Sequence, residues 1–285
     1  MPDVEGFHDP DTGTVTYIVT DPASSRAAVI DPVLDYDPKA ARTSTRSADA
    51  VIARVRERGI SLDWVLETHV HADHLSGIAY MKRAVGGRSG IGDRISLVQQ
   101  AFKDMFGFER EFHADGSQFD HLFADDEALS VGTIPGRVLH TPGHTPACVS
   151  YLIGDAVFTG DTLFMPDAGT ARADFPGGDA GSLYRSIRRI LSLPPQTRMF
   201  ICHDYGPGGR APAWQTTVAE QRARNVHVHD GVSEEQFVAL RTARDKTLSM
   251  PVLIIPSVQV NIRAGELPPA AENGMRYLRV PVNVL

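Results

Sequence analysis

The chain has 285 residues, 42% of them hydrophobic and 22% charged, and a formal net charge of −7 at pH 7. These values are typical of a globular protein with one large domain or two tightly joined ones. The acidic balance argues against a nucleic-acid-binding protein, which is expected to have a basic face. No stretch approaches the ~20 apolar residues of a membrane span, and no leader segment is visible. We therefore predict a cytoplasmic protein, and its two cysteines, Cys148 and Cys202, are too few for a disulfide framework.

The first third of the chain alternates β-branched apolar runs with amphipathic segments. Val51, Ile52 and Val55 recur at helical spacing, after Ser47 as a candidate N-cap and before Gly59 as a stop. The strand that precedes "THVHADHLSG" runs directly into this polar stretch. We expect strands at 14–21, 26–33 and 62–69 and helices at 48–59 and 75–87.

The rest of the chain repeats this order of strands followed by helices. Gly154 and Asp155 supply a two-residue hairpin turn. We expect strands at 137–140, 147–153, 156–159 and 198–206, helices at 96–108, 181–195, 214–226 and 233–250, a loop followed by a strand within 112–129, and an extended tail at 251–269. The chain thus predicts an α/β protein, with two mixed β-sheets sandwiched between outer helices.

Metal-ligand side chains follow several of the expected strands, next to glycine, proline or aspartate. Glycine lets the backbone approach a site closely, and imidazole and carboxylate suit first-row metals. The candidate ligands are His69, His71, Asp73 and His74 in "THVHADHLSG", His144 in "HTPGHTP", Asp161 in "FTGDTLF" and His203 in "ICHDYG". A lone histidine is usually structural, but one motif accounts for all of these.

The order His-x-His-x-Asp-His, then His, Asp and His, resembles the metallo-β-lactamase fold superfamily. The resemblance covers about residues 14–205 and implies an αβ/βα sandwich with the metal at one edge. It further implies a single domain of this type over 1–285, with a C-terminal extension from about residue 231.

Two enzyme classes within this superfamily share the ligand order. In a dinuclear zinc hydrolase of the glyoxalase II or lactonase kind, the metals lower the pKa of a shared water, and the hydroxide attacks a thioester or lactone. The resemblance then implies His69, His71 and His144 on one metal, Asp73, His74 and His203 on the other, and Asp161 bridging.

In the second class one metal is bound by His69, His144 and Asp161. Two imidazoles and one carboxylate leave three positions open, as in non-haem Fe(II) oxygenases. The ligands alone do not separate the two classes, and a metal-binding or sulfide-responsive accessory protein is a third, non-enzymatic interpretation.

The flanking sequence favours the second class. "GTARADFPGGDAGSLYRSI", "LPPQTRMFICHDYGPGGR" and "PSVQVNIRAGELPP" resemble the bacterial branch of the persulfide dioxygenase family. This resemblance implies one Fe(II) per chain, with zinc as a possible substitute, and a homodimer. It also implies oxidation of glutathione persulfide by dioxygen and water to sulfite and glutathione, a step in sulfide detoxification.

The same resemblance implies roles for residues around the metal. His71, Asp73, His74 and His203 would orient ligands and hydrogen-bond to water or oxygen at the metal. Glutathione carries two carboxylates, so the predicted substrate-binding residues are Arg172, Tyr205 and Arg210, with Asp174 fixing Arg172.

The other histidines and cysteines are interpreted as structural. His140 lies one strand-end position from the motif, and Cys148 is expected to pack. Polar loops are the interpretation for His113, Asp115 and His121 in "FHADGSQFDH", and no metal role is assigned to His227 and His229 in "NVHVHD".

Overall fold

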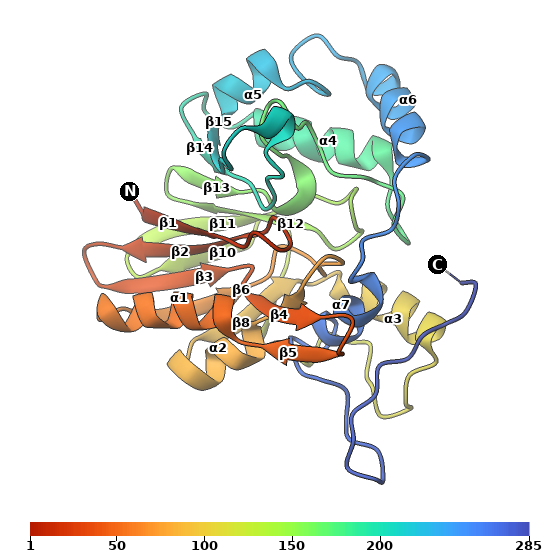
Figure 1. Ribbon diagram of the computed structural model, residues 1–285. Coiled ribbons are helices and arrows are strands. Elements are labelled where there is room, and N and C mark those ends of the chain that lie inside the picture. The colour runs from red at the N-terminus through yellow and green to blue at the C-terminus, as the bar shows by residue number, and fades with distance from the viewer. Residues whose placement is uncertain (285) are drawn as a thin grey trace.

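Two six-stranded sheets lie face to face in the computed structural model, which describes residues 1–284, and helices cover their outer faces (Figure 1). This arrangement confirms the predicted sandwich of two mixed sheets between helices. Within residues 1–284, no helix is both long enough and apolar enough to cross a membrane.

The first sheet has the strand order β1-β2-β3-β6-β8-β9. Its first three strands pair antiparallel, and the pairs from β3 to β9 are parallel, so it is mixed. Its strands are β1 (Asp3–His8), β2 (Val15–Asp21), β3 (Arg26–Ile30), β6 (Ser61–Leu66), β8 (Arg88–Gly92) and β9 (His121–Phe123).

The second sheet has the order β10-β11-β12-β13-β14-β15 and is antiparallel except for the β13–β14 pair. The predicted turn at Gly154 and Asp155 joins β12 to β13. Its strands are β10 (Ala128–Val131), β11 (Ile134–His140), β12 (Val149–Ile153), β13 (Ala156–Phe158), β14 (Arg198–Phe200) and β15 (Gln215–Thr217).

Alternate side chains of these strands form the core between the sheets. Val15, Tyr17 and Val19 of β2 point into this layer, whereas Ile18 packs in the outer layer beneath the helices. The hydroxyl of buried Tyr151 crosses the layer and donates to Glu67 O at 2.8 Å. The two sheets are therefore joined by apolar packing and by polar bonds next to the ligand-bearing loop.

Helices pack on both outer faces (Figure 1). On the first sheet lie α1 (Arg46–Glu57), α2 (Ile78–Val85), α3 (Ile95–Phe106) and α7 (Ile254–Asn261), and on the second lie α4 (Ala180–Leu191) and α5 (Val218–Arg224), with α6 (Glu234–Asp245) beside α4. A small third sheet joins β4 (Val33–Asp37), β5 (Arg42–Ser44) and β7 (Leu75–Ser76) at one edge.

The predictions for the start of α1 and for the end of β3 are wrong. The N-cap of α1 is Thr45 rather than Ser47, whose N–H and hydroxyl both donate to Asp35, at 3.0 and 2.7 Å. The expected strand at 26–33 breaks at Asp31, which has φ +51°, and the chain turns there into β4.

The predicted extended tail is also wrong, because residues 254–261 form α7. All but one of its residues are buried. A helix that is buried on nearly every side has no polar face, so its sequence lacks the helical period that would reveal it. Pro256 lies in its first turn, where the missing N–H costs no helical hydrogen bond. The short strands β1, β4, β5, β7, β8 and β15 were not predicted, and β7 and β15 lie where the sequence predicted the starts of helices.

Candidate metal centre

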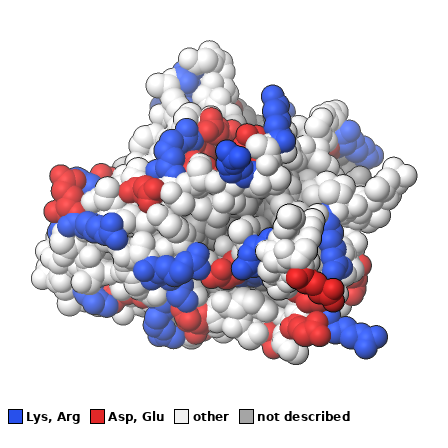
Figure 2. Space-filling view, turned by 60° about the horizontal axis from the view of Figure 1, so that its bottom comes forward, with Lys and Arg blue, Asp and Glu red and all other residues white. Residues whose placement is uncertain are grey.

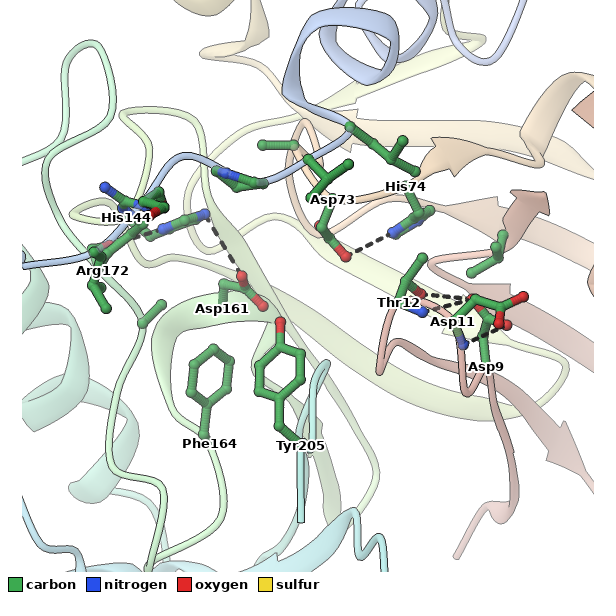
Figure 3. Close-up of a pocket in the computed structure, with 18 of the residues that line it drawn as sticks. Asp9, Asp11, Thr12, Asp73, His74, His144, Asp161, Phe164, Arg172 and Tyr205 are labelled. Atoms are coloured by element: carbon green, nitrogen blue, oxygen red, sulfur yellow. Dashed lines mark hydrogen bonds and ion pairs between the residues drawn. The ribbon is translucent and has the colours of Figure 1, made fainter. Parts of the chain in front are cut away.

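All seven candidate ligands meet at one edge of the sandwich, between the two sheets. Figure 3 shows four of them, Asp73, His74, His144 and Asp161, facing the pocket. The loop after β6 carries the histidine motif, His144 follows β11, Asp161 follows β13 and His203 follows β14. At Gly160, φ is +51° and a Cβ atom would lie 2.6 Å from Thr68 Oγ1. Glycine at this position therefore lets the Asp161 turn approach the histidine motif closely.

His69, His144 and Asp161 form the first group. Their metal-binding atoms lie within 4.8 Å of one another, and all three side chains are buried. Asp161 Oδ2 is 3.9 Å from His69 Nε2 and 3.6 Å from His144 Nε2. Two imidazoles and one carboxylate thus point at a common centre.

Hydrogen bonds orient both imidazoles of this group. His144 Nδ1 lies 2.8 Å from the carbonyl oxygen of Arg172, so Nδ1 carries the proton and Nε2 presents a lone pair. His69 Nδ1 lies 3.0 Å from Thr68 Oγ1, whose own proton goes to Asp31 Oδ2 at 2.8 Å. His69 therefore also presents Nε2 to the centre.

The protonation of the group suits metal binding. Burial lowers the pKa of His144 to about 4 and that of His69 well below its usual value, so both rings are neutral at pH 7. Burial raises the pKa of Asp161 to about 6, so this carboxyl is ionised at pH 7. Two neutral imidazoles and one carboxylate are the donor forms that divalent metals require.

Asp73, His74 and His203 lie next to this group. Asp73 Oδ2 is 3.3 Å from His74 Nδ1 and 3.5 Å from His203 Nε2, and Asp161 Oδ1 is 3.3 Å from His203 Nε2. Buried Thr14 lies within 3.4 Å of all three side chains through its hydroxyl oxygen. Asp161 therefore connects the first group to a second potential one.

His71 is directed into a buried pair of carboxylates. Its Nε2 lies 3.1 Å from Asp31 Oδ1 and 3.0 Å from Glu67 Oε2. Burial alone would lower the pKa of His71, but these two carboxylates raise it well above its usual value. Asn261 of α7 donates to the carbonyl oxygens of His71 and His74, both at 2.8 Å, so the C-terminal helix holds the motif loop.

The buried polar atoms at the centre fit a bound metal ion. His69 Nε2, His71 Nδ1, His74 Nε2, His203 Nε2 and Asp161 Oδ1 are buried and have no hydrogen-bond partner within residues 1–284. Orphaned polar atoms of this kind are costly unless something binds them. Nitrogen and carboxylate donors suit iron and zinc alike, so the donor set does not identify the metal.

A pocket of about 1230 Å³ leads from the centre to the surface. Figure 2 shows one face of the molecule hollowed near its middle, with side chains of both charges around the hollow. In Figure 3 the rings of Phe164 and Tyr205 stand beside Asp161, and the Tyr205 hydroxyl points toward it. The Tyr205 ring is parallel to the His203 ring, with centroids 6.0 Å apart.

The predicted substrate arginines are engaged with aspartates. Arg172 lines the pocket, but its Nε and Nη2 donate to Asp174 at 2.5 and 2.7 Å. Arg210 binds Asp167 and buried Asp204 and does not line this pocket. The roles of both arginines in substrate binding stay predictions.

Two other pocket-lining arginines, Arg42 and Arg244, were missed from the sequence. Within residues 1–284 neither takes part in an ion pair or a side-chain hydrogen bond, so both are available to an anion. Nothing in the sequence distinguishes them from solvated surface arginines. Thr14, Asp31 and Glu67 were also missed. They lie next to the ends of β2, β3 and β6, and nothing in the sequence shows that they contact the histidine motif.

The remaining histidines and Cys148 lie outside the metal centre, whereas the Sγ atom of buried Cys202 lies within 4.8 Å of ligand atoms of His71 and His203. His140 Nε2 lies 3.2 Å from Phe123 O and His121 Nε2 lies 2.6 Å from Glu127, whereas His227 lines the pocket wall. Burial raises the pKa of the Cys148 thiol to about 12. This thiol is therefore protonated at neutral pH and is no nucleophile.

The profile of the metallo-beta-lactamase superfamily matches residues 9–203. The chain belongs to this superfamily, as its fold and ligand order indicate. Within it, the chain is homologous to the ETHE1 persulfide dioxygenases. It is 31% identical to "Persulfide dioxygenase ETHE1, mitochondrial" of Bos taurus over 92% of this chain and 89% of that one. The crystal structure of ETHE1 from Myxococcus xanthus has a TM-score of 0.74 and 29% identity, and covers 93% of this chain and 100% of that one.

Other relatives are more similar in sequence and bear hydrolase-type names. A probable metallo-hydrolase of Burkholderia pseudomallei (strain 1710b) is 55% identical over 99% of both chains. Glyoxylase B2 of Dictyostelium discoideum is 48% identical over 99% of this chain and 97% of that one. The chain spans 65% of the length of a beta-lactamase hydrolase-like protein of Xylella fastidiosa (strain Temecula1), to which it is 51% identical.

Proposed function

We propose that this metalloenzyme is a persulfide dioxygenase that converts glutathione persulfide, dioxygen and water to glutathione and sulfite. The observation that carries the proposal is the group of His69, His144 and Asp161 at the base of the pocket. Homology to the ETHE1 persulfide dioxygenases supports it.

One Fe(II) ion is the proposed cofactor, bound by His69, His144 and Asp161. Bound Fe(II) supplies the open coordination positions and the electron donation that dioxygen chemistry requires. Thr68 and the Arg172 carbonyl orient the two imidazoles through their Nδ1 atoms. Because both Nδ1 atoms are already hydrogen-bonded, His69 and His144 would bind the ion through Nε2.

The surrounding residues position substrate and water. Asp73 stays ionised, because His203 and His74 hold its pKa well below the usual range although burial opposes this. Its carboxylate accepts a hydrogen bond from the water that the reaction consumes. Tyr205 directs its hydroxyl toward the persulfide, and Phe164 excludes bulk water from that side of the pocket.

The pocket suits an anionic thiol derivative. Arg42 and Arg244 are its unengaged cations, and they would bind the carboxylates of glutathione. Arg172 would contribute only after releasing Asp174, because the two already form a bidentate pair. We therefore assign the main part of anion recognition to Arg244 and Arg42.

A dinuclear hydrolase of thioesters or lactones is the second candidate. His74 Nε2 and His203 Nε2 are buried without a partner beside Asp73 and Asp161, and this favours a second ion at that position. The names of the more similar relatives point to the same class.

Oxygen uptake on anaerobically purified protein with counted metals distinguishes the two functions. One equivalent of iron, and oxygen consumption dependent on glutathione persulfide, is the expected result. Two equivalents of zinc, with hydrolysis of a glutathione thioester and no oxygen uptake, would overturn the proposal in favour of the hydrolase.

A further inference from the structure

The segment between Asp161 and α4 has no strand partner near Arg172. Residues 163–179 contain no helix or strand. Buried backbone N–H and C=O groups must nevertheless be hydrogen-bonded, so side chains from elsewhere must supply the bonds. For residues 170–173 these side chains come from the metal centre and from residues 227–245, which are called the C-terminal segment below.

The C-terminal segment holds this stretch of backbone at both ends. Thr170 N donates to His227 Nδ1 at 3.1 Å, and Thr170 O accepts from Arg241 Nη1 at 3.1 Å. Ala173 N donates to Asp245 Oδ2 at 2.9 Å. The bonds flank Arg172, whose carbonyl oxygen is the acceptor for His144.

Arg241 and Asp245 are themselves a buried ion pair on α6. They lie one helical turn apart, with side chains 1% and 6% exposed, and Arg241 Nε donates to Asp245 Oδ1 at 2.8 Å. The pair therefore presents one donor and one acceptor to the same short segment. A buried pair gives little net stability in itself, so its contacts with this segment are its distinctive feature.

We propose that the Arg241–Asp245 pair is a positioning device for the metal ligand His144. It fixes the backbone of residues 170–173 and with it the carbonyl oxygen of Arg172, which orients the His144 ring. Helix α6, which contributes no ligand, thereby sets the metal affinity of the centre. The inference rests on His144 as a metal ligand, which holds for one-metal and two-metal enzymes alike, so it is independent of the reaction proposed above.

Asp245→Asn tests this through metal release. The variant is loaded with Co(II), and its visible absorption and its rate of metal loss to a chelator are compared with those of the wild type. We expect metal affinity to fall about 10–100-fold, as loss of an outer partner of a ligand typically costs, and the Co(II) spectrum to shift. A folded variant whose affinity and spectrum both match the wild type would overturn the proposal.

Asp155→Asn is the control, because it breaks an Arg–Asp pair that makes no hydrogen bond to residues 170–173. Arg198 binds Asp155 at 2.8 and 2.9 Å, at the end of β13 opposite Asp161. The control is expected to leave metal release and spectrum unchanged, and an equal effect there would mean that general destabilisation is responsible.

A double variant, Arg241→Met with Asp245→Leu, addresses the case in which Asp245→Asn does not fold. Apolar replacement of a buried pair is often neutral for stability, yet it removes both backbone contacts. We expect weakened metal binding in a folded protein, and unchanged binding would refute the inference. If neither variant folds, hydrogen exchange on the wild type decides: metal binding must slow exchange at the Thr170 and Ala173 amides, and unchanged protection refutes it.

Discussion

The hydroxyl of Thr14 lies 3.1 Å from Asp73 Oδ2 and donates a hydrogen bond to it. The same oxygen is 3.2 Å from His74 Nδ1 and 3.4 Å from His203 Nδ1. The protein alone therefore holds Asp73 in place, and a second metal ion is not needed for its position. This relationship leads to the first prediction.

Asp73→Ala is expected to lower the catalytic rate strongly and to leave most of the iron bound. The reason is that Asp73 lies beside the His69–His144–Asp161 group rather than within it. Metal analysis of the purified variant, together with its kcat, checks this. Complete loss of metal would instead favour the dinuclear hydrolase.

Asp161→Ala is expected to remove metal and activity together. Asp161 is the only carboxylate of the group. Its removal should therefore lower metal affinity by more than the ~10–100-fold that loss of an outer hydrogen-bonding partner costs. Metal content after dialysis at fixed free iron is the measurement. Near-stoichiometric iron in this variant would contradict the assigned ligand set.

Arg244→Ala is expected to raise KM for glutathione persulfide roughly tenfold, with kcat within about twofold. A tenfold change corresponds to about 1.4 kcal/mol, the size of one charge-assisted hydrogen bond at a partly exposed site. Arg224→Ala, at an exposed arginine outside the pocket, is the control. An unchanged KM in the Arg244 variant would exclude this residue from substrate binding.

His227 is expected to make the free energy of unfolding depend on pH. Burial, and then Arg241 and Arg244, lower its pKa to about 4. Between about pH 6.5 and pH 4, His227 is therefore protonated in the unfolded chain but neutral in the folded protein. Stability should therefore fall as the pH drops from about 6.5 toward 4, by at most about 1 kcal/mol per pH unit after solvent screening.

Replacement of His227 by Asn tests this dependence. An Asn side chain still offers an acceptor to Thr170 N–H but does not titrate. Chemical denaturation of both proteins between pH 7 and pH 5 gives the comparison. Parallel stability profiles would show that His227 contributes nothing to the acid sensitivity.

The grouping of the candidate ligands was largely predictable from the sequence, because each ligand-bearing stretch is recognisable by itself. Each of the four ligand-bearing stretches follows a strand, and strand ends at the same edge of a sandwich meet. The surroundings were not predictable in this way. The partners of Arg172 and Arg210, which are Asp174, Asp167 and Asp204, become evident only when the chain is folded.

The fold was predictable where one face of a helix or strand is buried and the other is exposed to solvent. Helix α7 lacks this contrast, since residues on every side of it are buried, and its proline suggested an extended tail. The strands within residues 33–44 were missed for another reason. Its strands β4 and β5 pair only with each other and with two-residue β7, so they need little of the apolar alternation that marks a strand.

The division of the ligands between the two sheets links metal supply to protein lifetime. His69 follows a strand of the first sheet, whereas His144 and Asp161 follow strands of the second, so an ion bound by all three would be a reversible cross-link between the two halves of the chain. A ligand that binds only the folded state adds about 2.7 kcal/mol of stability at a hundred times its dissociation constant. Metal starvation would then lower not only turnover but also resistance to proteolysis, and the abundance of the protein would follow the metal in the cell.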